Sequence, residues 1–323
     1  TVPVAPRHQP DDQYPLILNT GRIRDQWHTM TRTGLAPTLG AHLPEPYVDL
    51  HPSDALASGV RDGGLARVSS AWGGLVARVR LSGELRRGQV FVPIHWTDQF
   101  ASDARVGALV NPVVDPVSGE PEFKHTPVRI DEFRADWHGV IFSRETLDLE
   151  RLAWWARIQT EDAQRYEIAG RGACKDRSAW ARQLFGVGSA DADWIEYRDE
   201  SGGIYNAAWF VDGRLQACVY IAPRDMLPQR GWLADLFMRM RLSPRDRLSL
   251  LAAAPIGAAS DDGPLVCSCF RVGRHAITRA IKDGGLTTPK QVTACLRAGG
   301  NCGSCVPEIR SLIAECALSE EVA

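Results

Sequence analysis

Short runs of apolar residues, separated by Gly, Pro and Asp, dominate the first part of the chain. Between residues 14 and 130 they include YPLILNTG, PYVDLHP, ARVSSAWGGLVARVRL and QVFVPIHW. Runs of this length with turn residues at both ends predict strands, and we expect the strands to close into a barrel. Among them, Pro52, Ser53 and Asp54 predict the capped start of one short helix.

The middle of the chain mixes helical and strand patterns. Between about Glu145 and Trp180, the segment LDLERLAWWARIQTEDAQRYEIAG has apolar residues at helical spacing and predicts a bridging helix. The segment WIEYRDESGGIYNAAWFVDGRLQACVYIAP is broken at Ser-Gly-Gly and at Asp212-Gly213, which predicts a hairpin. WLADLFMRMRL predicts a trailing helix, and the broken apolar stretch from Leu250 to Ala259 predicts a linker.

The last part of the chain predicts three helices. The first follows Cys269 and ends at Gly284-Gly285, and the second begins with Thr288 as N-cap and Pro289 as the first helical residue. Gly299-Gly300 predicts its end, and a third helix follows Pro307. These patterns divide the chain into three predicted domains, at residues 12–135, 136–255 and 263–318.

Composition and charge narrow the function classes. The chain has 323 residues, 44% of them hydrophobic, and a formal net charge of -2 with both signs interspersed. No basic stripe is present for nucleic acid or for an anionic membrane, so we expect neither partner. No signal or transit peptide is visible at the start, which favours a cytoplasmic location.

The cysteines carry the clearest chemistry. Six of the eight lie in the last quarter of the chain, which favours a metal site in a reducing compartment over a disulfide scaffold. Cys267-Ser-Cys269 and Cys302-Gly-Ser-Cys305 form two tight pairs, each placed before a predicted helix whose N-terminus favours negative charge. Structural zinc is the alternative, although its usual knuckles are C-x₂₋₄-C and not C-x-C.

A family resemblance then sharpens this site. The segment VCSCFRVGRHAITRAIKDGG, followed by TACLRAGGNCGSC, resembles the bacterioferritin-associated-ferredoxin type of [2Fe-2S] domain. The resemblance implies that the cluster ligands are Cys267, Cys269, Cys302 and Cys305. Cys295 and Cys316 fall on apolar helical stripes, and we expect both to be buried structural thiols.

The β-rich part resembles a second family. TGRIRDQWHTMTRTG is a donor-rich loop after a strand, and HPSDALASGVRDGGLARVSS, FVPIHW and NPVVDPVSGEPEFKHTPVRI accompany it. Together they resemble the dinucleotide-binding domain of the molybdopterin oxidoreductases, a double-psi β-barrel. The resemblance implies that molybdopterin guanine dinucleotide is bound by Thr20, Gly21, Arg22, Ile23, Arg24, Asp25, Gln26, Trp27, His28, Thr29 and Lys124.

The order of the parts resembles the catalytic subunits of bacterial assimilatory nitrate reductases. The implied fold is mainly β plus α: the double-psi barrel, a small α+β module and a small helical [2Fe-2S] domain. The implied reaction is molybdenum-dependent reduction of nitrate to nitrite, with electrons supplied by a flavoprotein, ferredoxin or flavodoxin. We expect the long intervening segment to keep the [2Fe-2S] domain apart from the pterin site, as an electron inlet.

Two observations keep alternatives open. The family's [4Fe-4S] motif and molybdenum ligand have no counterpart here, so we expect this chain to be an incomplete part of the enzyme. Gly107 stands where the family commonly has Asn, which removes an amide able to contact the pterin. The alternatives are another molybdopterin oxidoreductase, such as a formate dehydrogenase, and a free-standing [2Fe-2S] electron-transfer protein. His28 and His95 are expected to form hydrogen bonds, not to bind a metal.

Overall fold

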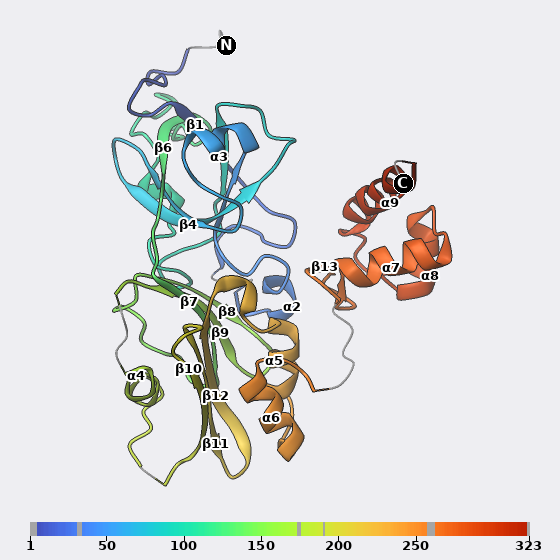
Figure 1. Cartoon of the computed structure of the whole chain (residues 1–323). Helices are drawn as coiled ribbons and strands as arrows, with labels where there is room; N and C mark the ends of the chain where they lie inside the picture. The colour runs from blue at the N-terminus through green and yellow to red at the C-terminus, as the bar shows by residue number, and fades with distance from the viewer. Residues whose placement is uncertain (1–4, 31–33, 173–175, 190, 257–261, 322–323) are drawn as a thin grey trace.

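The computed structural model describes residues 5–30, 34–172, 176–189, 191–256 and 262–321. A barrel, a six-stranded sheet with helices on both faces, and a small helical module follow one another along the chain (Figure 1). The last of these lies to one side of the other two, beside the short helix α2, Pro37–Gly40. No helix in the described ranges is long and apolar enough to cross a membrane.

The first part closes into a six-stranded barrel with the order β1-β5-β2-β4-β3-β6. Strand β1 pairs in parallel with β5, and β2 pairs in parallel with β4, while the other neighbours run antiparallel. The strands are β1 Leu16–Gly21, β2 Tyr47–Leu50, β3 Leu65–Ser69, β4 Gly74–Leu81, β5 Gln89–Pro93 and β6 Thr126–Glu132.

The barrel interior is filled by aliphatic side chains, among them Leu18, Val48 and Val79, which are fully buried. The helix α3, Pro52–Ala57, lies where it was predicted, but its N-cap is His51, whose ring accepts a hydrogen bond from the Ser53 amide. Asp54, expected at the cap, instead accepts a bond from the Gly88 amide at 2.7 Å. His51, which lies just before the predicted cap residues, is therefore the N-cap of this helix.

The second part is an antiparallel sheet with the order β10-β11-β12-β7-β9-β8. Helix α4, Arg177–Leu184, covers one face, while α5, Arg230–Phe237, and α6, Pro244–Ala252, cover the other (Figure 1). The strands are β7 Trp137–Ser143, β8 Trp154–Gln159, β9 Gln164–Gly170, β10 Asp193–Asp199, β11 Ile204–Val211 and β12 Arg214–Ala222.

The predicted bridging helix is wrong. Its central residues form the hairpin β8–β9, in which Trp154, Ala156 and Ile158 are buried while the residues between them are partly exposed. That alternation has a period of two, and it was hidden by Leu149 and Leu152, which extend an apparent helical spacing into the strand. The turn is closed by the Thr160 amide, which donates to the Ala163 carbonyl at 2.8 Å.

Two other predictions for this part have different outcomes. The hairpin turn at Asp212-Gly213 is confirmed, since both residues have positive φ, 51° and 76°, as a two-residue type I′ turn requires. The linker predicted from Leu250 begins too early, because α6 continues to Ala252 and buries Leu250. Residues 257–259 of that stretch lie outside the described residues.

The C-terminal module has three helices around a small core. They are α7 Arg274–Gly284, α8 Pro289–Leu296 and α9 Val306–Glu321, preceded by the short strands β13 Leu265–Cys267 and β14 Val272–Gly273. Thr288 caps α8 through a full capping box with Gln291, as predicted. Helix α8 ends at Leu296 with Arg297 as its C-cap at φ 63°, two residues before Gly299, where its end was expected.

Candidate functional site

The loop predicted to bind the dinucleotide leaves the barrel at the end of β1. Thr20 is buried there, and its hydroxyl donates to the Phe123 carbonyl at 2.9 Å. Lys124 donates through Nζ to the Thr20 carbonyl. The fold therefore brings together the start of the loop and Lys124, which lie about a hundred residues apart in the sequence.

His95 fixes the course of this loop through two hydrogen bonds to its backbone. It is fully buried; its Nε2 accepts from the Ile23 amide at 2.9 Å, and its Nδ1 bonds the His28 carbonyl. One acceptor and one donor nitrogen describe a neutral imidazole, and burial lowers the pKa of His95, which keeps it neutral. The expectation that His95 is a hydrogen-bonding residue is confirmed.

The segment before Lys124 is held by a residue that the sequence did not single out. Asn111 is buried, and its Nδ2 donates to the Glu122 carboxylate at 3.0 Å and to the His125 carbonyl at 2.9 Å. These bonds hold Glu122 and His125, which lie on either side of Phe123 and Lys124 in the sequence. Gly107 lies nearby in the sequence, in a 3₁₀ turn where a Cβ would meet nothing within 4 Å, so lack of space does not explain the glycine.

Several side chains of the loop are exposed to solvent. Arg22, Trp27, His28 and Thr29 are exposed, with Trp27 at 58%, so this tryptophan is neither core nor wall of the barrel as it stands. In the described part of the chain, the Arg22 side chain makes no hydrogen bond or ion pair. An unpaired guanidinium two residues after Thr20, whose carbonyl Lys124 contacts, fits the phosphates of a dinucleotide.

Arg24 and Asp25 have partners of a different kind. Arg24 donates to the Glu308 carboxylate and to the Val266 carbonyl, both at 2.9 Å, and pairs with Asp25 at 2.8 Å. His42, just after α2, lies 3.0 Å from the Asp25 carboxylate. Burial would raise the pKa of Asp25, but the nearby His42 and the bonds from Arg24 outweigh this and lower it to about 2. That these two residues line a dinucleotide stays a prediction.

The contact with Glu308 and Val266 also corrects the expected separation of the domains. The C-terminal module touches the loop that follows β1, despite the long segment between them. Sequence distance was a poor guide because α6 lies against the sheet, whereas the module that follows it in the sequence lies beside α2 and the loop after β1 (Figure 1).

The four predicted cluster ligands form two pairs, each with one cysteine from either motif. The sulfurs of Cys269 and Cys302 lie 3.4 Å apart, and the Cys267 thiol lies close enough to that of Cys305 to raise its pKa. No disulfide joins the described cysteines, and none of their groupings gathers three metal-binding side chains around one point. Zinc needs four ligands around one ion, whereas each iron of a [2Fe-2S] cluster takes two cysteines, so the pairs fit the cluster.

The local environment of the two pairs differs. Cys305 is buried directly before α9, and burial raises the pKa of its thiol to about 11. Cys302 is exposed, and a hydrogen bond with Ser304 at 3.1 Å lowers the pKa of its thiol. Cys316 is buried as expected, but Cys295 is exposed, because α8 packs through Val292 and turns Cys295 outward.

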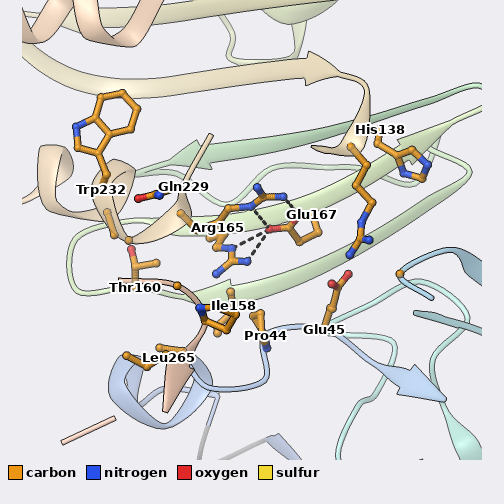
Figure 2. A pocket seen from close by; sticks show the side chains of 18 of the residues that line it. Pro44, Glu45, His138, Ile158, Thr160, Arg165, Glu167, Gln229, Trp232 and Leu265 are labelled. Atoms are coloured by element: carbon orange, nitrogen blue, oxygen red, sulfur yellow. Dashed lines mark hydrogen bonds and ion pairs between the residues drawn. The ribbon is translucent and has the colours of Figure 1, made fainter. Parts of the chain in front are cut away.

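A cleft of about 1580 Å³ lies between the barrel, the sheet and the C-terminal module. At its centre Glu167 accepts bonds from Arg165 and Arg230, each as close as 2.7 Å (Figure 2). Burial opposes the charge of Glu167, but the two guanidiniums outweigh it and hold the pKa of this carboxyl far below its ordinary value. The walls carry both signs of charge, which does not select one class of ligand.

His138 stands at one end of the cleft, at the start of β7 (Figure 2). Burial and then the nearby Arg78 lower the pKa of its ring to about 4, so the imidazole is neutral near pH 7. Its Nδ1 is buried and has no hydrogen-bond partner in the described structure. The sequence offered no local sign of this histidine or of the pairing between Glu167 and Arg230.

Family comparisons agree with both sites. Residues 16–127 match the molydopterin dinucleotide binding domain, and residues 265–315 match the BFD-like [2Fe-2S] binding domain. The chain contains both cofactor domains. The predicted fold class, with a closed barrel first and a small cluster domain last, is thereby confirmed, as are molybdopterin dinucleotide and a [2Fe-2S] cluster as its cofactors.

The relatives of the chain include nitrate reductases. It is 38% identical to a nitrate reductase from Klebsiella oxytoca, in a match that covers 97% of this chain and 36% of that protein. An assimilatory nitrate reductase catalytic subunit from Bacillus subtilis is 34% identical over 40% of this chain and 18% of its own length. The chain thus spans about a third or less of these relatives.

Other matches are confined to part of the chain. The alpha subunit of an F420-dependent formate dehydrogenase from Methanocaldococcus jannaschii is 34% identical over 38% of this chain and 17% of its own. Among solved structures, acetylene hydratase from Pelobacter acetylenicus is 21% identical, covers 37% of this chain and 18% of its own, and has a TM-score of 0.34.

Proposed function

We propose that this chain is the C-terminal portion of an assimilatory nitrate reductase, which reduces nitrate to nitrite with two electrons and two protons. The observation that carries the proposal is the match of 38% identity to a nitrate reductase along 97% of the chain, through both cofactor domains and the sheet between them. The formate dehydrogenase match covers only 38% of the chain, and therefore favours this alternative less.

Within this proposal, the loop after β1 and Lys124 hold one side of the molybdopterin guanine dinucleotide. Arg22 and Lys124 offer positive charge to its phosphates, and the buried His95 keeps the loop in the conformation that presents them. The molybdenum of this cofactor supplies the two-electron chemistry, while a [4Fe-4S] cluster is expected in the rest of the enzyme.

The four cysteines hold the [2Fe-2S] cluster, which receives electrons one at a time from a donor protein. Cys302 is exposed, whereas Cys267 and Cys305 are buried, so one edge of this site is open to an approaching donor. A flavoprotein, ferredoxin or flavodoxin would each serve as that donor. We propose a cytoplasmic location, which suits both the reduced thiols and such donors.

The first experiment measures what the purified chain binds. Iron and acid-labile sulfide at two each per chain, with the absorption spectrum of a [2Fe-2S] cluster, are the expected result. One zinc per chain without labile sulfide would contradict the proposal.

The second experiment uses the full-length enzyme truncated before Leu265. We expect it to reduce nitrate with a low-potential dye, which reaches inner centres directly, but not with the physiological donor protein. The control is the intact enzyme with an equal molybdenum content. Loss of dye-driven activity in a folded, molybdenum-loaded truncation, or retained activity with the natural donor, would show that the module is not the electron inlet.

A further inference from the structure

The C-terminal module meets the barrel through a small group of charged side chains, Arg24, Asp25, His42 and Glu308. Arg24 bridges the two parts: it pairs with Asp25 on its own loop at 2.8 Å and with Glu308 on α9 at 2.9 Å. His42 approaches the same two carboxylates, at 3.0 Å from Asp25 and 3.7 Å from Glu308. We call these four residues the docking cluster.

The contacts on the module surround its cysteines. Arg24 also donates to the carbonyl of Val266 at 2.9 Å, and the Ser268 hydroxyl lies 3.5 Å from Asp25. Val266 and Ser268 are the two neighbours of Cys267, while Glu308 lies one turn beyond Cys305 on α9. The module therefore faces the loop with the end that carries its ligands, and not with a random part of its surface.

The docking cluster is more than an exposed ion pair. The side chains of Asp25 and His42 are only 8% and 12% exposed, and that of Arg24 is 20% exposed. Exposed pairs contribute little because water competes for both partners, but here several charges share one partly buried site. The flat guanidinium serves two carboxylates and a backbone carbonyl at once, which an ammonium group could not do with the same geometry.

We propose that Arg24 and Asp25, on the loop after β1, form the docking face for the [2Fe-2S] module, and that Arg24 is the positioning residue that holds the module there and raises the reduction potential of its cluster. Reduction adds one negative charge to the cluster, and a nearby fixed positive charge stabilises that state. The inference rests on the proposed cluster content of the four cysteines.

The test compares the cluster-loaded chain with three variants, Arg24→Gln, Arg24→Lys and Glu308→Gln. Redox titration followed by electron paramagnetic resonance gives the potential, and small-angle scattering gives the radius of gyration. We expect Arg24→Gln to lower the potential and to enlarge the particle as the module leaves the loop. Arg24→Lys should lower the potential less than Arg24→Gln does, because lysine retains the positive charge.

Glu308→Gln separates docking from local charge. Removing a negative charge near the cluster would by itself raise the potential, whereas undocking takes Arg24 away and lowers it. We expect a lower potential together with a larger particle. The matched control is Arg310→Gln, which removes an exposed charge on α9 that makes no hydrogen bond or ion pair in the described structure; its potential and size should stay close to those of the unmodified chain.

An unchanged potential and size in Arg24→Gln, or a raised potential in Glu308→Gln without expansion, would overturn the inference. A chain that binds no iron would instead contradict the proposed function, and the scattering result would still decide whether the module docks through Arg24. Circular dichroism of each variant checks that the barrel and the sheet remain folded.

Discussion

The barrel and the C-terminal module each have a candidate cofactor site, but the site stands in a different relation to the hydrophobic core in each. The barrel has a complete apolar core of its own, and its candidate binding residues lie on a loop outside that core. In the module, the candidate ligands Cys267 and Cys305 are themselves buried members of the core, beside Ile277, Ile309 and Leu312.

This difference teaches which part needs its cofactor in order to fold. A barrel filled with aliphatic side chains gains its stability from burial, with or without a ligand. A small three-helix module buries few side chains in all, and its thiols are among them, so metal binding becomes part of its folding free energy. Cofactor loss should therefore affect the two regions unequally.

The largest effect is expected for Cys305→Ser. The variant should lose nearly all its iron and the cooperative unfolding of the module, because a hydroxyl does not replace a core thiolate ligand. Iron analysis and amide hydrogen exchange of residues 265–318 measure both effects, while the barrel should keep its protection. Cys295→Ala is the control, since that thiol is exposed and unpaired with the others. A variant with full iron content would remove Cys305 from the ligand set.

A core substitution in the barrel should also lower stability strongly, but the loss of stability should not depend on iron. Leu18→Ala removes a fully buried side chain and should lower the free energy of unfolding by about 2 to 5 kcal/mol. Leu56→Ala, at a side chain that is 83% exposed, should change it little. Urea unfolding with and without chelator makes the comparison, and a chelator-dependent difference at Leu18 would break the distinction between the two regions.

Substitution of the candidate binding residues on the loop after β1 should lower cofactor occupancy but leave folding unchanged. In the full-length enzyme, Arg22→Ala or Lys124→Ala should reduce molybdenum and guanine nucleotide content, since each charge-assisted bond contributes about 1.5 to 3 kcal/mol. Arg86→Ala, at an exposed side chain without a partner in the described structure, serves as control. Equal occupancy in all three variants would show that the loop does not face the cofactor.

A moderate, pH-dependent effect is expected where the barrel meets the sheet. His138 has a folded pKa of about 4, below its ordinary value of 6.5, so folding favours the neutral ring. Its contribution is fully present above pH 6.5 and is lost as the pH falls towards 4. The difference between the two pKa values corresponds to about 3 kcal/mol, which solvent screening at this partly exposed ring reduces to about 2 kcal/mol. Urea unfolding at pH 7 and pH 4.5 should show a smaller acid loss in His138→Gln; parallel losses would contradict this origin.

The sequence predicted the two regions unequally, for physical reasons. The module could be predicted closely because its signals are local: a capping residue at Thr288, a glycine stop at Gly285, and four cysteines in two short motifs. The hairpin β8–β9 could not, because its strand periodicity merges with apolar residues before it, and only pairing with β7 resolves the choice.

The candidate site shows the same limit. The loop after β1 and Lys124 were identified by resemblance, and the fold places them side by side. The docking cluster was missed, because Arg24 and Glu308 lie 284 residues apart and no spacing rule joins them. Cys295 was misjudged because an apolar neighbour at helical spacing does not show which way the helix faces.

Each cysteine pair joins the first motif to the second, so a bound cluster would act as a double cross-link around the helices between them. The inner crossing, Cys269 to Cys302, closes a loop of 33 residues, and by the loop-closure relation for disulfides one such link stabilises by about 4 kcal/mol through the entropy removed from the unfolded chain. A stretching force applied to α9 would act on the iron–sulfur bonds before it acted on α7 or α8. The module should thus resist stretching up to a single rupture, and then extend by the whole enclosed segment at once.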